Sequence, residues 1–332
     1  MIQAIESRRG SRVICCLTSD RQNANGILAK DFIPIFFSHL QNLEDHDRVD
    51  LFMFTLGGDT LAAFGLSRLI REFATKVGCL VPEKCHSAGT LLAIGSDEIF
   101  MTRAATLSPI DPSVTGTLNP QVELAPGQRQ VVPISVESVA GFKALVTEDW
   151  KLDRDGVNAA FRMLAERINP LALGDVYRSR QQIAPLARKL LSVHRSDKDK
   201  LEGIIGTLTT ELGSHDYLIS RTEAREMLTT QVLPDDAELE KLVWDLFQGF
   251  SVEMELGQVY DASMAWNAAR ATGTPTAQPL VVKQQLVVIE SLWGRDVWER
   301  DILVLGRQVN TPAGPVETVQ QQIVQNGWKH YD

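Results

Sequence analysis

Two successive strand-to-helix junctions constrain the fold of this chain more than any other feature. Residues 50–54 form a short apolar strand that leads into a Gly-Gly-Asp turn at 57–59, and apolar residues then recur at helical spacing over 61–73. Residues 77–81 form a second apolar strand, followed by the small, turn-prone segment 85–90, a buried helical stretch and a third strand at 97–101. Strands that alternate with helices in this way predict a mostly parallel sheet with right-handed crossovers.

The two junctions carry groups suited to chemistry at a carbonyl carbon. Paired glycines such as Gly57 and Gly58 let a backbone approach a ligand closely and aim its amides. In a parallel sheet both turns lie at the carboxyl ends of the strands, where ligands bind. Ser87 stands at the start of the second helix, where unpaired N–H groups can stabilise the oxyanion that forms when a serine attacks a carbonyl. The alternative is that Ser87 only caps the helix, which serines often do.

Three motifs follow one another in a recognisable order: Gly-Gly-Asp at 57–59, Ser-Ala-Gly-Thr at 87–90 and Ser-Pro-Ile-Asp-Pro at 108–112. Over residues 12–228 this order resembles the ClpP/crotonase superfamily, and within it the SppA-like serine proteases called the serine dehydrogenase proteinase family. The resemblance implies an α/β fold, a ClpP/crotonase-like spiral of βαβ units, here with a C-terminal α+β appendage.

The resemblance also implies roles for individual residues of the two junctions. It places the nucleophile at Ser87 and the oxyanion hole at the backbone N–H groups of Gly58 and Ala88. Gly57 and Gly89 complete the oxyanion and substrate-binding turns.

The general base stays open between two hypotheses, because a serine hydroxyl is a weak nucleophile without one. ClpP uses Ser-His-Asp and SppA-type peptidases use Ser-Lys, and this sequence matches neither directly. In the first hypothesis the acid and the imidazole have exchanged segments, so that Asp111 orients His215 and His215 serves Ser87; a triad is defined by its geometry and not by chain order. The bland alternative is that Asp111 caps a turn and His215 satisfies a loop carbonyl.

The second hypothesis uses Lys143, the first lysine after an irregular segment at 115–130. A lysine base must be desolvated and neutral, and Phe142, Leu145 and Val146 are expected to supply apolar walls. The alternative is an exposed lysine on a helix. We favour His215, because it lies in a segment that resembles the acid-bearing segment of ClpP.

Other reactive side chains fit structural roles better. Cys85 precedes Ser87 by two positions, but the resemblance puts the nucleophile at Ser87, and His86 is expected to line the cleft. The cysteines at 15, 16, 79 and 85 show no metal-ligand spacing and are expected to be buried free thiols. Cys15 and Cys16 are neighbours in a predicted strand and should therefore point to opposite faces. We predict no metal and no cofactor.

The net charge and the hydropathy pattern argue against some classes of partner for this chain. Its net charge is −9, which argues against nonspecific binding to nucleic acid or to an anionic membrane surface. No run approaches the roughly 20 apolar residues that span a bilayer, and no signal peptide is recognised. We therefore expect a cytoplasmic protein without stable membrane insertion.

The chain is expected to comprise a protease domain at 1–233 and a C-terminal appendage at 234–332 for oligomerisation or docking of an accessory protein. Further predicted elements are a strand at 12–18, helices at 31–43, 135–145, 156–191, 201–212 and 239–256, a surface loop at 115–130, a linker at 272–279, a β-hairpin at 280–309 and a short helix at 316–328.

These observations predict a serine peptidase that acts on a peptide or protein substrate through an acyl-enzyme on Ser87. We expect a homo-oligomer, because ClpP-like proteases enclose their sites by assembly. Two alternatives remain: a crotonase-like acyl-CoA enzyme, which uses paired amides without a serine nucleophile, and a non-catalytic scaffold of the same fold.

Overall fold

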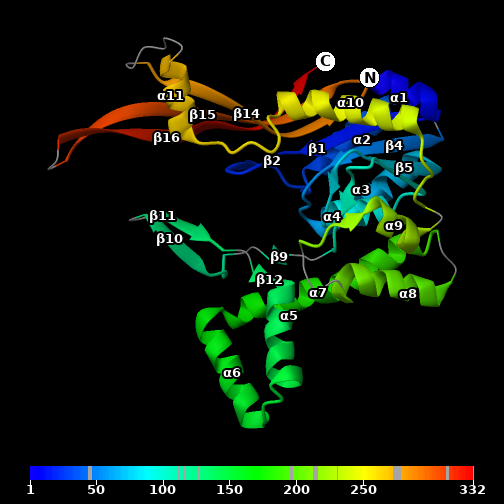
Figure 1. The fold of residues 1–332 in the computed structure, drawn as a ribbon, viewed down its shortest axis with the longest axis horizontal. Helices are drawn as coiled ribbons and strands as arrows, with labels where there is room; N and C mark the ends of the chain where they lie inside the picture. Colours follow the sequence, from blue (N-terminus) through cyan, green and yellow to red (C-terminus); the bar gives the residue numbers. More distant parts are fainter. Residues whose placement is uncertain are drawn as a thin grey trace.

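A mixed α/β arrangement around one large sheet organises the protein (Figure 1). The structure is a computed structural model and describes residues 1–43, 47–110, 113–114, 117–125, 128–132, 134–194, 197–211, 216–229, 231–271, 278–311 and 314–331. Within these ranges the sheet has seven strands in the order β16-β15-β14-β1-β4-β5-β7. Its strands are β1 (Arg12–Thr18), β4 (Arg48–Phe54), β5 (Lys76–Val81), β7 (Glu98–Met101), β14 (Leu280–Glu290), β15 (Arg295–Thr311) and β16 (Gly314–Tyr331).

The parallel half of the sheet confirms the alternation expected from the sequence. Strands β1, β4, β5 and β7 pair in parallel, whereas β14 pairs antiparallel with β1 and begins an antiparallel meander through β15 to β16. Because parallel neighbours end at the same edge of a sheet, the turns after β4 and β5 lie at one edge.

Helices cover both faces of this sheet. One face carries α1 (Ile2–Arg9) and α10 (Ala237–Glu253), and the other carries α2 (Phe32–Asn42), α3 (Thr60–Phe73), α4 (Ala88–Ile94) and α11 (Ala262–Ala271). Alternate residues of β1 enter the two cores, so Cys15 and Cys16 point to opposite faces as predicted. All four cysteines are buried and free.

A group of helices extends from the α4 side of the sheet, and α5 and α6 form an arm that reaches away from it (Figure 1). The group comprises α5 (Val136–Ala144), a π-helical turn at Leu145–Asp149, α6 (Arg154–Arg167), α7 (Pro170–Leu191), α8 (Lys198–Gly206), a second π-helical turn at Thr207–Glu211 and α9 (Arg221–Leu228). The predicted helical stretch at 156–191 is therefore two helices. The break falls where Ile168 becomes extended, Asn169 caps α7 and Pro170 occupies its first position.

Short strands complete the fold: β2 (Asp20–Arg21), β3 (Ala24–Asn25), β6 (Lys84–Cys85), β8 (Thr106–Leu107), β9 (Ser113–Val114), β10 (Gln121–Ala125), β11 (Gln128–Val131), β12 (Ile134–Ser135) and β13 (Ile219–Ser220). Among the helices in the described ranges, none has both the length and the apolar character that a bilayer-spanning segment needs.

Two element predictions are wrong. Residues 316–328 are not a short helix but part of β16, which pairs with β15 along its length. The segment 115–130 is expected from the sequence to be an irregular loop, but it contributes residues to two antiparallel strands, β10 and β11. The predicted hairpin at 280–309 is confirmed by the pairing of β14 with β15. The division of the chain at residue 233 stays a prediction, although strands and helices from both sides of it share one sheet and its two cores.

Candidate active site

The two turns singled out in the sequence lie side by side. Thr55, directly after β4, forms a parallel bridge with Cys85 of β6. Its N–H donates to the Lys84 carbonyl at 2.9 Å, and its own carbonyl accepts the His86 N–H at 3.0 Å. This pairing holds the start of the Gly-Gly turn against the start of the Ser87 turn, as the parallel topology predicted.

Gly57 then passes directly over Ser87. A methyl group on Gly57 would lie 2.7 Å from Ser87 Cβ and 3.1 Å from Ser87 Oγ, and the φ angle of Gly57 is 113°. A side chain at this position is therefore excluded both by conformation and by space. The turn needs glycine here so that its backbone can approach the serine.

Ser87 adopts a backbone conformation that non-glycine residues rarely take. Its φ is 51° and its ψ is −112°, between the end of β6 and the first residue of α4. A strained turn between strand and helix carries the nucleophilic serine of α/β-hydrolases. The side chain makes no helix-capping bond, which argues against the alternative that Ser87 only caps α4. Ser87 is 5% exposed, and its Oγ has no hydrogen bond to another described residue.

A set of buried hydrogen bonds holds Ser87 in this conformation. The Ser87 N–H donates to Ser108 Oγ at 2.8 Å, and Ser108 Oγ donates to the Pro109 carbonyl at 3.0 Å. Thr90 Oγ1 accepts the Ser108 N–H at 3.1 Å and lies 2.9 Å from the carbonyl oxygens of Cys85 and Ser108. Residues on both sides of Ser87 are thus tied to one segment, which opposes relaxation of the strained backbone.

A second buried set positions the glycine turn. Thr18 Oγ1 donates to Thr55 Oγ1 at 2.8 Å, and the Gly57 N–H donates to the same oxygen at 3.0 Å. Leu28 then pairs with the residues on either side of Gly58. Its N–H donates to the Gly57 carbonyl and its carbonyl accepts the Asp59 N–H, both at 2.9 Å. Sequence reasoning missed Thr18, Thr55 and Ser108, although Thr55 and Ser108 stand next to or within the motifs that it used.

Among the described residues, these bonds leave two backbone amides of the two turns without a partner. Within the described part of the chain, neither the Gly58 N–H nor the Ala88 N–H donates a hydrogen bond, although the N–H groups of Gly57, Ser87 and Gly89 all do. The Ala88 N–H is one of the orphan donors at a helix start, and Gly58 follows the residue packed against Ser87. Gly89, also predicted to shape the site, packs closely on the Thr55 methyl group and on Cys85 Sγ.

Of the three residues named in the two base hypotheses, the structure describes only Lys143. His215 and Asp111 lie outside the described residues, so the exchanged triad stays a prediction. Lys143 is exposed on α5, in the arm, and lines an apolar cavity of about 210 Å³ that Phe142 and Val146 also line. The expected apolar walls are thus partly present, but the cavity lies among α5, α6 and α7.

The two side chains before Ser87 point elsewhere. Cys85 is fully buried, and its Sγ packs beneath Gly89 and forms a hydrogen bond with Cys79, which together with burial raises the pKa of the Cys79 thiol. His86 Nε2 lies 2.8 Å from Thr106 Oγ1. Because it is buried, Cys85 lacks the accessible thiolate that a nucleophilic cysteine needs.

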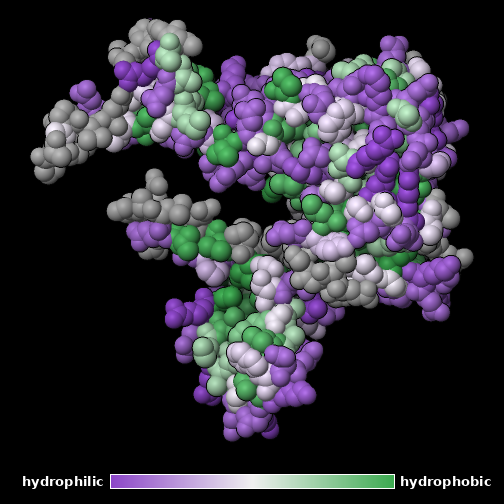
Figure 2. Space-filling view, viewed as in Figure 1, coloured by the Kyte–Doolittle hydropathy of each residue, from purple (hydrophilic) through white to green (hydrophobic). Residues whose placement is uncertain are grey.

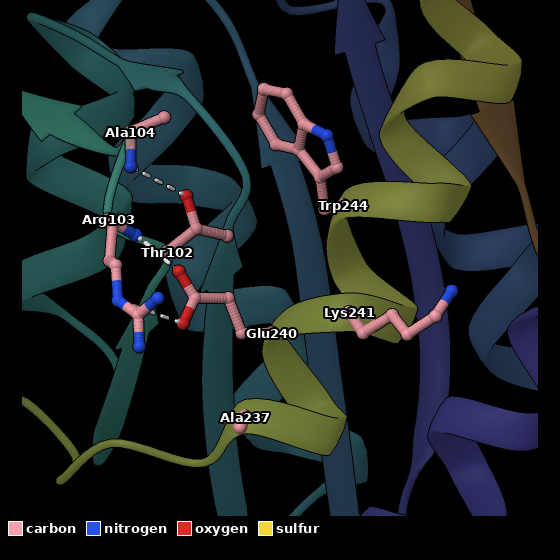
Figure 3. A pocket seen from close by; sticks show the side chains of 7 residues that line it. All are labelled: Thr102, Arg103, Ala104, Ala237, Glu240, Lys241 and Trp244. Atoms are coloured by element: carbon pink, nitrogen blue, oxygen red, sulfur yellow. Dashed lines mark hydrogen bonds and ion pairs between the residues drawn. The ribbon is translucent and has the colours of Figure 1, made fainter.

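A separate cavity of about 370 Å³ lies where α10 docks on the loop after β7 (Figure 3). The Glu240 carboxylate accepts the Arg103 N–H at 2.8 Å, while Lys241 points away from this pair. Trp244 forms another wall. The cavity thus marks a docking contact of the C-terminal region with the core, and Ser87 is not among its lining residues.

Comparison with known proteins bears on the first part of the chain. Residues 1–130 match a family model. It is described as ClpP-like SDH-type serine proteinase. This match confirms the resemblance for the segment that holds both turns and Ser87, and it supports a serine peptidase in general.

Individual proteins show more limited similarity. Two uncharacterized proteins of Methanocaldococcus jannaschii, MJ1495 and MJ0137, are 32% and 28% identical over 124 and 125 residues. Each match covers 34% of this chain and 41% or 42% of the relative, so the chain spans about two fifths of their length. Among solved structures, a membrane-bound stomatin-specific protease, 1510-N, is 12% identical with a TM-score of 0.38, covering 64% of this chain and 77% of that one. ClpP1 from Listeria monocytogenes is 13% identical with a TM-score of 0.37, covering 71% and 97%.

Proposed function

We propose that the protein is a serine peptidase that cleaves peptide bonds through an acyl-enzyme on Ser87. The observation that carries this proposal is the strained backbone of Ser87, beside which Gly57 packs closely. Within the described residues the Ser87 side chain accepts and donates no hydrogen bond, and neither do the Gly58 and Ala88 N–H groups donate one. A buried serine that only stabilised the fold would be expected to use its hydroxyl for a hydrogen bond.

The proposed reaction follows from these groups. Ser87 Oγ attacks the carbonyl carbon of the substrate while its proton passes to the general base. The carbonyl oxygen becomes an oxyanion and accepts hydrogen bonds from the Gly58 and Ala88 N–H groups. Collapse of this intermediate expels the amine, which takes the proton from the base, and water then releases the acyl group from Ser87 by the reverse sequence.

For the base we propose His215, oriented by Asp111, in preference to Lys143. The exposure of Lys143 supports this choice, because a lysine base has to be desolvated. With an imidazole base, activity should rise through about pH 6.5 and then level off. His215→Gln should abolish that rise while Lys143→Gln leaves it in place; the opposite pattern would transfer the role to the lysine.

The proposed peptidase works as a cytoplasmic homo-oligomer, with the C-terminal region available for an accessory protein. Exposed apolar side chains in the arm support assembly: Phe161 and Met163 of α6 are 57% and 68% exposed. Figure 2 shows apolar surface on this arm. Light scattering at micromolar concentration should give a mass well above that of one chain, and a monomer would contradict this part of the proposal.

Fluorophosphonate labelling tests the proposed activity. The folded protein should gain one adduct, peptide mapping should place it on Ser87, and Ser87→Ala should remove it. Cys85→Ala is the matched control. It removes the thiol near Ser87 but leaves the serine in place, so this variant should still be labelled. An adduct on another residue, or none on the folded protein, would contradict the proposal and favour the scaffold; binding of coenzyme A without labelling would favour an acyl-CoA enzyme.

A further inference from the structure

The outer edge of β16 is a long strand edge that the described chain leaves uncovered over residues 318–328. β16 is the last strand of the central sheet and pairs on one side with β15 from Thr311 and Gly314 to Arg295 and Tyr331. Within the part of the chain that the structure describes, no backbone hydrogen bond joins the other side of residues 318–328 to another segment. Its peptide groups on that side are therefore available to a further strand.

The opposite edge of the same sheet is treated differently. There β7 is only four residues long, and the chain covers it with a bridge between Ile99 and Val232. The Ile99 N–H donates to the Gln231 carbonyl at 2.7 Å, and the Leu233 N–H donates to the Ile99 carbonyl at 2.8 Å. The fold thus blocks its short edge and, among the described residues, leaves the outer edge of β16 open over residues 318–328.

The middle of this edge also lacks the usual protection against pairing. Residues 318–328, which we call the edge segment, read TVQQQIVQNGW and contain no charged residue and no proline. Natural edge strands normally carry such residues to prevent association. Ile323 and Val324 in the middle of the segment are 54% and 53% exposed.

The edge segment is held rigidly at one end. Trp328 Nε1 donates to Asp31 Oδ2 at 2.8 Å, and its ring packs edge-on against Phe32 at 5.5 Å. Towards the other end, the Tyr260 hydroxyl donates to Gln321 Oε1 at 3.3 Å. A strand that is already fixed in its extended form loses little conformational entropy when a second strand pairs with it.

We propose that the edge segment pairs with the edge segment of a second copy of this chain, antiparallel about a two-fold axis. Two-fold pairing brings each residue near the axis opposite its own copy, so any charge there would meet a like charge. An uncharged stretch in a chain of net charge −9 fits this partner. Pairing over the edge segment would form about ten hydrogen bonds, at about one per paired residue, which is as many as a typical protein interface carries.

Cysteine cross-linking on the full chain tests the proposal. The four native cysteines are buried, so an exposed cysteine introduced singly at Gln320, Gln322, Val324 or Asn326 reports on its own surroundings. Under mild oxidation at least one of these variants should form a disulfide-linked dimer. Val252→Cys, at a position of α10 that is 78% exposed, is the matched control and should stay unlinked.

Charge variants provide an independent arm. Gln322→Lys with Val324→Lys should at least halve the mass found by light scattering, as should Gln322→Glu with Val324→Glu. An equimolar mixture of the two should recover the original mass, because opposite charges then face each other. Unchanged masses together with no cross-link at any position would overturn the proposal. A wild-type monomer that binds an extended peptide at this edge would also overturn it, since the occupant would then not be a second copy.

Discussion

Replacing Ser108 with alanine should slow the acylation of Ser87 while the protein stays folded. Ser108 is 2% exposed, and its Oγ accepts the Ser87 N–H at 2.8 Å. Alanine removes this acceptor and leaves a buried N–H group without a partner, which costs about 1–3 kcal/mol. The strained conformation of Ser87 stores a comparable amount, about 1–3 kcal/mol, and persists only while its surroundings enforce it.

The expected effect on rate follows from these magnitudes. If relaxation of Ser87 misplaces its hydroxyl by the same free energy, acylation slows by about 5- to 150-fold, at 1.36 kcal/mol per factor of ten. The assay is the second-order rate of fluorophosphonate labelling, with urea unfolding of the same samples as a measure of stability.

Ser96→Ala is the matched control for this prediction. Ser96 is also buried, at the other end of α4, but its Oγ only donates to the Leu92 carbonyl at 3.2 Å, so its removal orphans no N–H group. This variant should label within about twofold of wild type. Equal labelling rates for Ser108→Ala and wild type would refute the idea that Ser108 holds the nucleophile in place.

Three further predictions concern the glycine turn and the other end of the sheet. Gly57→Ala should abolish labelling, because the added methyl group would lie 2.7 Å from Ser87 Cβ, while circular dichroism should still report a folded protein; labelling at the wild-type rate would contradict the packing of the two turns. Thr55→Val removes the acceptor of the Gly57 N–H and should lower kcat more than it raises KM in a peptide-cleavage assay, whereas Thr55→Ser should restore most of the loss; equal effects of both variants would indicate a packing role. Burial would raise the pKa of Glu98, but bonds from Lys76 and Arg48 lower it to about 2. A folded pKa below the unfolded value of about 4.3 stabilises the protein above that pH and is lost as the pH falls towards about 2. Glu98→Gln should therefore be less stable than wild type at pH 7 in urea unfolding, and the difference should shrink below about pH 4.3; a constant difference would count against this charge cluster.

The sequence predicted the parallel half of the fold because its signals are local. Strands at 12–18, 50–54 and 77–81 are short apolar runs, and the Gly-Gly and Ser-Ala-Gly turns stand between each strand and its helix. Their meeting in space follows from the parallel topology alone, since neighbouring parallel strands end at one edge. This is why Gly57 and Ser87 could be expected to lie together before the structure was known.

The C-terminal tail was mispredicted because its local pattern is ambiguous. Val316, Val319, Ile323 and Val324 recur at a spacing typical of a helix, yet the segment pairs with β15 along its length. Long-range pairing with a strand overrides such a weak local preference. The same limit applies to Thr18 and Ser108, whose roles arise from hydrogen bonds to residues far away in the sequence or on another element.

The central claim is that Ser87 and the amides of Gly58 and Ala88 form one acyl-transfer site. A crystal structure of the protein after reaction with a peptidyl fluorophosphonate tests it most directly. We predict phosphorus bonded to Ser87 Oγ and one phosphonyl oxygen within about 3 Å of both the Gly58 and the Ala88 nitrogen atoms. An adduct on another residue, or a phosphonyl oxygen on Ser87 that contacts neither amide, would contradict the claim.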